Sequence, residues 1–533
     1  MNSRPPGPRR SPWAACAALV FAALAGCGGG GGSGGSSEAT PPVPVPPSTV
    51  NGPAWSNFGR DAQHAAQSGV AAQPLNRILW QARVDLAPQL SPNGSLLIHY
   101  GSPVITSRNT VVVPVKTGTS EGFRVEARAG ANGALLWSAD TDYLLPPHGW
   151  VPSYNVALTQ GNRLYFPGAG GKLLYRDDAD NPNGAVGSVV FYGNDVYDLA
   201  RSQYNATVVI NTPLAIDPAG NVYFGFVVTG ANAAGLTSGI ARVTPGGAGT
   251  WVAARAASGN AAIGKVATNS APALSNDMAT LYVAVATTPP APEHPSGMLV
   301  ALDAQTLATR GAIELRDPKT GALAWISDNG TASPTVGPDG DVYYGVLESD
   351  TPNHNFRGWL LHYDAALRET RTPGAFGWDD TVSIAPASMV PQYAGPSSYL
   401  LVAKYNNYAG VGTGDGRNRM AILDPRQAQA DAISPTVPVM GEVLTILGPT
   451  PMAGPPGAVR EWCINTVAVD PLTSSVMVNS EDGRLYRWHL PSNAFTEQVR
   501  FNNGYAEAYT PTAIGPDGAV YAINNSTLFA VGR

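Results

Sequence analysis

The chain has 533 residues, of which 13% are charged, and its formal net charge is −6. This balance excludes a broadly basic surface, so we expect no nucleic-acid partner. The 60 glycines and 47 prolines are too many for a mainly helical protein and are typical of short strands joined by turns.

Residues 1–26 are expected to be a signal peptide outside the fold. The arginine-bearing start MNSRPPGPRR precedes an apolar run, SPWAACAALVFAALAGC, which is too short for a membrane span and typical of a secretory signal. Its end, Leu24-Ala25-Gly26-Cys27, resembles the bacterial lipobox, in which the cysteine is acylated, for example with palmitate. We therefore expect an exported lipoprotein that contacts the membrane of the bacterial envelope through Cys27. An ordinary signal peptide is the alternative. In a Gram-negative cell, the lack of an Asp after Cys27 resembles the pattern of outer-membrane sorting.

Residues 27–54 are expected to form a tether to a folded body at 55–533. Their Gly/Ser-rich part is typical of a flexible coil, and their Pro-rich part is typical of stiffer, extended chain. Of the three cysteines, only Cys463 belongs to the body, so the body cannot contain a disulfide. Its stability must come from a large core, in which we expect Cys463 to be a small apolar residue.

One recurring phrase predicts the architecture of the body. ASPTVGPDGDVYYG (332–345) and TPTAIGPDGAVYAI (510–523) each contain a short apolar strand, a Pro-Asp-Gly turn and an alternating strand. Hairpins repeated roughly every 45 to 80 residues are the signature of a β-propeller. We predict an all-β, eight-bladed β-propeller, with seven blades as the alternative. Weaker copies of the phrase begin at Ser102, Asn155, Thr212, Ser270, Ile384 and Asn465.

A second hairpin follows several copies and predicts four strands in each blade. It is clear in residues 298–315, 358–372 and 483–501. The last copy stops early, at STLFAVGR, whereas residues 76–86 (NRILWQARVDL) form a spare strand near the start of the body. We predict that this N-terminal strand completes the last blade, because closing the ring in this way removes an open sheet edge.

Two segments resemble the tryptophan-docking motif of quinoprotein-type propellers, also called PQQ-like repeats. They are GANGALLW (130–137) and DPKTGALAW (317–325). The resemblance implies that Trp137 and Trp325 pack between blades and that Gly133 and Gly321 turn the chain. WSNFGRDAQHAAQSG (55–69) is similar to the lead-in of these proteins. The family includes quinone-dependent dehydrogenases and an outer-membrane assembly lipoprotein, so the fold does not decide the function.

For the dehydrogenases, the resemblance implies a quinone (PQQ) held between a tryptophan and a disulfide of two adjacent cysteines. A calcium ion bound by Glu, Asn and Asp polarises the quinone. This chain has no adjacent cysteines and no C-x-x-C-H motif for haem. We therefore do not expect PQQ as a cofactor.

The residues just before each repeat copy are expected to surround one mouth of the propeller. Many of them are acids, amides or tryptophans, which suit a cation or a hydroxyl-rich ligand. For calcium we favour Asp379, Asp380 and Glu507, since adjacent carboxylates repel each other unless a positive charge lies between them. The alternative is that these side chains only cap turns. The candidate ligand-binding residues are Asp379, Asp380, Glu461, Glu507, Asn329 and Trp378, with Asp328, Asn269, Asn211 and Trp462 as further members of the ring.

We expect the body to be a non-catalytic binding or scaffolding module whose partner is calcium, a glycan or an envelope protein. The alternative is an enzyme at the mouth, either quinoprotein dehydrogenase-like or polysaccharide-active, with Asp380 or Glu507 as the acid or base. The seven histidines show no metal-ligand spacing, so no zinc site is expected.

Overall fold

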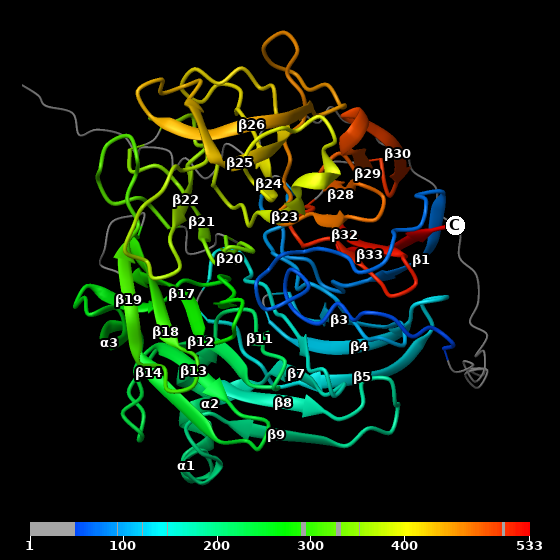
Figure 1. Cartoon of the computed structure of the whole chain (residues 1–533). Helices are drawn as coiled ribbons and strands as arrows, with labels where there is room; N and C mark the ends of the chain where they lie inside the picture. Colours follow the sequence, from blue (N-terminus) through cyan, green and yellow to red (C-terminus); the bar gives the residue numbers. More distant parts are fainter. Residues whose placement is uncertain are drawn as a thin grey trace, which may run out of the picture.

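The computed structural model has eight separate antiparallel sheets arranged around a central axis as a β-propeller (Figure 1). The predicted eight-bladed, all-β fold is confirmed, and the seven-bladed alternative is wrong. Each copy of the repeated phrase supplies the innermost strand of one blade and the strand that pairs with it. The residues described are 48–533 apart from 93, 120, 147, 289–294, 327–331, 351 and 504–506.

Blades 1 to 4 follow one another along the first half of the body. Blade 1 contains β2 (Val104–Ile105), β3 (Thr110–Lys116), β4 (Phe123–Ala129) and β5 (Leu135–Thr141). Blade 2 contains β6 (Ala157–Leu158), β7 (Leu164–Pro167), β8 (Lys172–Arg176) and β9 (Val186–Val190). Blade 3 contains β10 (Val208–Ile210), β11 (Ala215–Ile216), β12 (Val222–Val228), β13 (Gly239–Val243) and β14 (Gly249–Ala253). Blade 4 contains β15 (Ile263–Val266), β16 (Ala273–Leu274), β17 (Thr280–Thr287), β18 (Gly297–Asp303) and β19 (Thr309–Glu314).

Blades 5 to 8 complete the circle. Blade 5 contains β20 (Thr335–Val336), β21 (Val342–Val346) and β22 (Trp359–Tyr363). Blade 6 contains β23 (Ser383–Pro386), β24 (Tyr399–Tyr405), β25 (Arg419–Ala430) and β26 (Pro438–Leu447). Blade 7 contains β27 (Ala468–Asp470), β28 (Ser475–Ser480), β29 (Arg484–His489) and β30 (Ala494–Arg500). Blade 8 contains β31 (Ala513–Ile514), β32 (Val520–Asn524), β33 (Thr527–Gly532) and β1 (Arg77–Arg83).

Helices are few and short. The α-helices are α1 (Asn194–Leu199), α2 (Arg201–Thr207) and α3 (Ala254–Ser258), and the 3-10 turns are η2 (Ala169–Gly171), η3 (Ala387–Met389) and η4 (Leu490–Ser492). Among the described residues, no helix has the length and apolar character needed to cross a membrane.

Blade 5 departs from the predicted four strands. The hairpin expected at 358–372 gives β22, but its second arm makes only isolated bridges, Tyr363 with Thr370 and Leu360 with Gly374. Pro373 explains the interruption, because proline has no N–H to donate to a ladder. Its carbonyl instead accepts the N–H of Met440 in β26, so the arm joins blade 5 to blade 6.

The ring is closed by the pairing of β1 with β33, the first and last strands of the chain (Figure 1). The two strands run antiparallel, and Trp80 lies opposite Ala530. The prediction that an N-terminal strand completes the final blade is confirmed. Blade 8 thereby gains its outermost strand, and the two ends of the folded body lie side by side.

Outer-strand tryptophans hold neighbouring blades together. Trp137 of blade 1 donates its indole N–H to the carbonyl of Ala179 in blade 2 at 2.8 Å, as the resemblance implied. Trp80 of blade 8 does the same to Gly130 of blade 1 at 2.6 Å, although no motif in the sequence marked it. Gly133 has a φ of 72°, and a Cβ there would lie 2.7 Å from the Trp80 ring. Only glycine satisfies both constraints.

The segment 52–73, here called the belt, crosses the end of the propeller at which the inner strands finish. The innermost strand of a blade is a sheet edge, and its unpaired N–H groups need acceptors. The belt supplies one acceptor to each of blades 1 to 7. The bonded N–H groups, all at 2.7–3.0 Å, belong to Ile105, Leu158, Ile216, Leu274, Val336, Ile384 and Val469.

Blade 8 is bound in the opposite sense, since Gln73 of the belt donates its N–H to the carbonyl of Gly518 at 2.8 Å. Most belt acceptors are backbone carbonyls, but blade 3 is held by the buried side chain of Asn57, which bonds both the N–H and the carbonyl of Ile216. The lead-in noted in the sequence is therefore the part of the chain that touches every blade.

Replacing Trp80 with alanine should destabilise the ring at its closure. The side chain is nearly fully buried and provides the indole hydrogen bond to blade 1, so we expect a loss of about 3–5 kcal/mol. Chemical unfolding monitored by tryptophan fluorescence measures the loss. Gln81→Ala, at an exposed position of the same strand, is the matched control and should change stability by less than about 0.5 kcal/mol. Equal effects of the two substitutions would contradict this role of Trp80.

Candidate functional site: the mouth of the propeller

The mouth is defined here as the ring of residues that precede the eight inner strands, at the end opposite the belt. Part of this ring is structural. Thr381 donates its N–H to Asn465, and Asn465 donates its N–H to Tyr509, which joins blades 6, 7 and 8. Thr510 then bonds the carbonyl of Tyr100 at 3.1 Å and joins blade 8 to blade 1.

The two asparagines predicted for the ring belong to this structural set. The Asn269 carboxamide oxygen accepts the N–H and hydroxyl of Ser153, and Asn211 donates to the carbonyl of Val266. Both amides satisfy backbone groups, as the alternative interpretation expects, and a ligand-binding role for them stays a prediction.

Asp380 carries an unsatisfied carboxylate oxygen at the mouth. Its side chain is only 2% exposed, and its Oδ2 atom has no hydrogen-bond partner. Burial raises the pKa of Asp380 to about 8, although the ammonium and the backbone N–H of Lys404 act in the opposite direction. The carboxyl is therefore mainly neutral at pH 7, which limits the cost of leaving an oxygen unpaired.

Glu507 is a second such carboxyl, in the segment that leads into blade 8. Its Oε1 accepts the N–H of Tyr509 at 2.7 Å, while its Oε2 is buried without a partner. Burial raises the pKa of Glu507 to about 8. Buried polar atoms without partners are rare in folded proteins, and Asn211 Oδ1 is a further one at the same mouth.

Lys404, at the end of β24, is the cation at the centre of this acidic group. It is 1% exposed, and its ammonium lies 5.8 Å from the centre of the Phe376 ring and 5.1 Å from that of Tyr509. The ammonium lowers the pKa of both Asp380 and Glu461 against the larger effect of burial. One lysine thus acts on carboxyls from blades 6 and 7.

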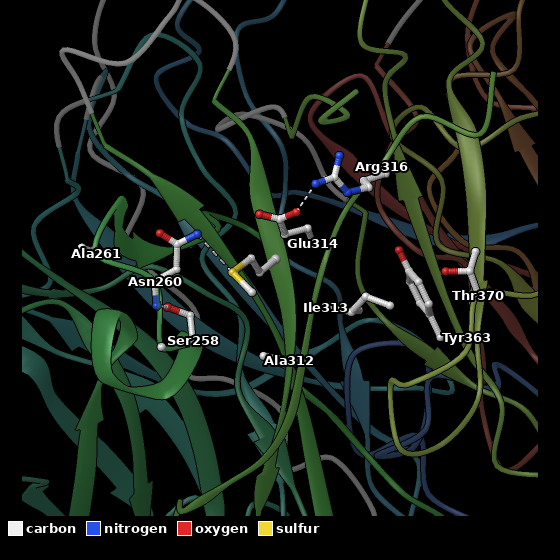
Figure 2. Close-up of a pocket in the computed structure, with 11 residues that line it drawn as sticks. Ser258, Asn260, Ala261, Ala312, Ile313, Glu314, Arg316, Tyr363 and Thr370 are labelled. Atoms are coloured by element: carbon white, nitrogen blue, oxygen red, sulfur yellow. Dashed lines mark hydrogen bonds and ion pairs between the residues drawn. The ribbon is translucent and has the colours of Figure 1, made fainter. Parts of the chain in front are cut away.

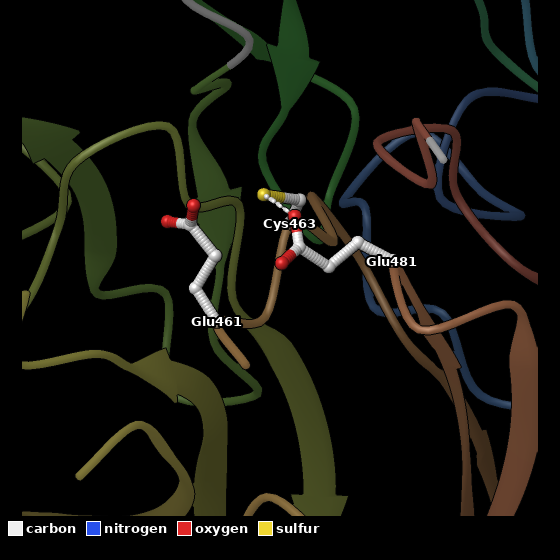
Figure 3. A group of neighbouring side chains, drawn as sticks. All are labelled: Glu461, Cys463 and Glu481. Atoms are coloured by element: carbon white, nitrogen blue, oxygen red, sulfur yellow. Dashed lines mark hydrogen bonds between the residues drawn. The ribbon is translucent and has the colours of Figure 1, made fainter. Parts of the chain in front are cut away.

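Glu461 belongs to a compact cluster with Cys463 and Glu481, seen in Figure 3. The Cys463 thiol donates to Glu481 Oε2 at 3.2 Å. Burial raises the pKa of Glu461 to about 7, and burial together with the nearby Glu461 raises the pKa of Glu481 to about 8. Cys463 is buried as predicted, but its sulfur faces carboxyl groups and not the apolar core.

Other predicted site residues are placed differently. Trp378 and Asp379 line a cavity of about 10 Å³ with Tyr344, which holds at most one water. Trp462 is fully buried in a core cluster, so its predicted role as a stacking surface is wrong. Asp328 and Asn329 lie outside the described residues.

The predicted calcium ligands are not brought together as one group. Among the residues that the structure describes, the acidic or thiol side chains close enough to share an ion are Glu461, Cys463 and Glu481, and not Asp379, Asp380 and Glu507. A calcium site on those three residues stays a prediction. Sequence reasoning missed Glu481 and Lys404, because both stand at the ends of second strands and not before inner strands.

A larger hollow of about 650 Å³ lies away from the mouth, between the outer parts of blades 4 and 5 (Figure 2). Its charged residues, Glu314 and Arg316, pair with each other. Asn260 donates to the sulfur of Met298 at 3.6 Å. The hollow therefore contains no charged group that requires a ligand, and none of the predicted site residues lines it.

Of the comparisons with known proteins, the one with solved structures gives matches. No family model matches the chain, and no curated protein matches its sequence significantly. A europium-containing methanol dehydrogenase has a TM-score of 0.53 and 10% identity over 88% of this chain and 89% of its own. A quinohemoprotein alcohol dehydrogenase from Comamonas testosteroni has a TM-score of 0.52 and 13% identity, and the match covers 90% of this chain and 81% of its own. BamB from Moraxella catarrhalis has a TM-score of 0.43 and 11% identity, and the match covers 86% of this chain and 99% of its own.

The two dehydrogenase likenesses support the β-propeller fold of this chain and nothing finer. At such identities they give no information about activity. The quinone implied by the resemblance needs a disulfide of adjacent cysteines. The body has Cys463 alone, and its sulfur contacts Glu481. The residues of this mouth do not fit that way of holding a quinone.

The raised pKa of Asp380 predicts a pH-dependent gain from Asp380→Asn. A carboxyl pKa of about 8 in the fold, against 3.8 ordinarily, favours folding only while the carboxyl is neutral. Wild-type stability should therefore fall between about pH 4 and pH 8, and the variant should escape this loss. We expect a gain near zero at pH 4 and on the order of 1–3 kcal/mol at pH 9.

Thermal and urea unfolding across this pH range test the prediction. Asp195→Asn, on the exposed surface of α1, is the control and should change stability by less than about 0.5 kcal/mol. If the relative stability of Asp380→Asn instead fell as the pH rose, Asp380 would be an ionised partner of Lys404.

Proposed function

We propose that the protein is an exported, lipid-anchored propeller that acts as a non-catalytic binding module, and that the mouth is its binding face. The ligand class we favour is one that presents positive charge or several hydroxyl groups, such as calcium or a glycan. This proposal extends the fold-level likeness to quinoprotein-type propellers and does not derive from the activity of any neighbour.

The observation that carries the proposal is the pair of buried, unpartnered carboxylate oxygens at the mouth, Asp380 Oδ2 and Glu507 Oε2. A buried acceptor without a partner costs about 1–3 kcal/mol, so the fold gains from any ligand that satisfies it. The belt uses the opposite end of the propeller to bind the inner strands of seven blades and the hairpin turn of the eighth. The two ends therefore differ in kind, and the mouth is the end at which buried carboxyl oxygens lack partners.

An enzyme remains the second candidate, and one observation favours it. Burial raises the pKa of Asp380 and of Glu507 to about 8, which is suited to a general acid at neutral pH. A glycosidase needs such an acid together with a second carboxylate. The nearby carboxyls of Asp379 and Glu461 supply candidates, so glycan cleavage is tested together with glycan binding.

Binding at the mouth predicts that calcium or a glycan raises the melting temperature of the wild type and not of the double variant Asp380→Asn, Glu507→Gln. A ligand at 100 times its Kd should stabilise the protein by about 2.7 kcal/mol. Calorimetric melting with calcium and with a glycan panel measures this, and a reducing-sugar assay on the same samples detects cleavage. Asp195→Asn should respond as the wild type does. No shift with any ligand, or equal shifts in the wild type and the double variant, would exclude the mouth.

The anchor is tested separately in the producing bacterium. Labelling with a palmitate analogue should modify the wild type and leave Cys27→Ser unlabelled. The variant should also move from the membrane fraction to the soluble fraction, because its only lipid attachment is gone. Unlabelled wild type would exclude lipidation and would leave the proposal for the mouth unaffected.

A further inference from the structure

The cluster of Glu461, Cys463 and Glu481 has the dimensions of a metal site (Figure 3). One donor atom from each side chain lies within 4.8 Å of the other two. In a tetrahedral zinc site with bonds of about 2.0–2.3 Å, ligand atoms lie about 3.3–3.8 Å apart. The observed 3.2 Å between Cys463 Sγ and Glu481 Oε2 is already in contact range. Small rotations of the glutamates would complete the set.

The backbone that carries Glu461 and Cys463 is fixed by the core. Trp462 and Ile464 alternate with them along an extended segment and are both 1% exposed, so the two ligand side chains point to the other side. Asn406 accepts the N–H of Trp462 and donates to its carbonyl, both at 3.0 Å. These contacts hold the two donors in register without any contribution from a metal.

Glu481 is held by a second buried amide. It follows β28, and the carbonyl of the preceding Ser480 accepts the side-chain N–H of Asn524 at 2.8 Å. Asn524 also donates to the carboxamide oxygen of Asn479 at 3.1 Å, and both asparagines are fully buried. Rigid support of this kind is what allows a metal site to keep its geometry.

Asp380, which precedes the inner strand of the neighbouring blade, carries an unsatisfied buried oxygen at the same mouth. Asp380 is 2% exposed, and its Oδ2 atom is buried without a partner. The ammonium of Lys404 acts on both Asp380 and Glu461, so the two carboxyls face the same cation. The guanidinium of Arg460 also acts on both Glu461 and Glu481, so the spacing of the three donor atoms is what favours a metal at this cluster.

We propose that Glu461, Cys463 and Glu481 bind a zinc-like divalent cation through one thiolate and two carboxylates. The thiolate selects zinc, cobalt or cadmium over calcium and magnesium, which take oxygen ligands. Binding releases to solvent the Cys463 proton and any proton held by the two glutamates, since the thiolate and the carboxylates are the ligand forms. The fourth position is assigned to water, as in zinc sites with three protein ligands.

This inference is independent of the proposed calcium or glycan binding, because it requires the sulfur of Cys463. Loss of calcium or glycan binding in the Asp380, Glu507 double variant would not affect the thiolate signal described next. Equally, loss of that signal would leave the calcium and glycan measurements as they are.

Cobalt(II) titration of the purified full-length protein, reduced and freed of metal, tests the site. Cobalt takes the same ligands as zinc and gives a near-ultraviolet thiolate-to-metal absorption band. We expect the band to saturate at one equivalent and to disappear when zinc is added. Cys463→Ser should remove it, and because the substitution changes no other cysteine, its loss assigns the band to Cys463. Glu481→Gln should weaken binding by about tenfold or more.

The control is Glu369→Gln, an exposed glutamate of blade 5, which should bind cobalt as the wild type does. A wild type without the band, or a band that persists in Cys463→Ser, would overturn the proposal. If Cys463→Ser does not fold, alkylation of Cys463 in the wild type by iodoacetamide decides the question. Zinc should slow that alkylation at least tenfold, and an unchanged rate would also overturn the proposal.

Discussion

The structure depends on how the edges of its eight separate sheets are satisfied. A four-stranded sheet has an inner and an outer edge, and each exposes backbone groups that would otherwise pair with another chain. The strands of the blades alone leave these edges unsatisfied. The belt gives an acceptor to the inner edge of seven blades, and β1 completes the sheet of the eighth. One short N-terminal stretch, 52–83, therefore binds the inner edge of seven blades and supplies the outermost strand of the eighth. It thereby holds the blades in the ring that surrounds the mouth.

Much of the fold could be predicted because the strands and turns of each blade follow from a local, repeated sequence pattern. The turn at Pro338 and Gly340, and its copies, fix hairpins by backbone chemistry that a single repeat reveals. The belt could not be predicted in this way. Its hydrogen bonds join residues that are distant in the chain, such as Gln63 and Val336, and no local pattern encodes them.

The candidate site was predictable only in part for the same reason. Glu461 and Asp380 precede inner strands, so alignment of the repeats placed them at the mouth. Cys463 has the sequence context of a core residue, and only the position of Glu481, at the end of another strand, gives its sulfur a polar partner. The argument against zinc rested on histidine spacing, which says nothing about a site built from one thiol and two carboxyls.

The belt also constrains how the molecule can form. The partners of the belt extend from Ile105 to Gly518. Strand β1 pairs with β33, which ends one residue before the carboxyl terminus, so the pair can form only after almost the whole chain has been made. Contacts of such long sequence separation are slow to form, because the intervening chain must first be ordered. A nascent or truncated chain that lacks the last blade leaves its opening residues without partners. The propeller should thus assemble as one cooperative unit, unlike open repeat arrays, in which each module needs only its neighbours.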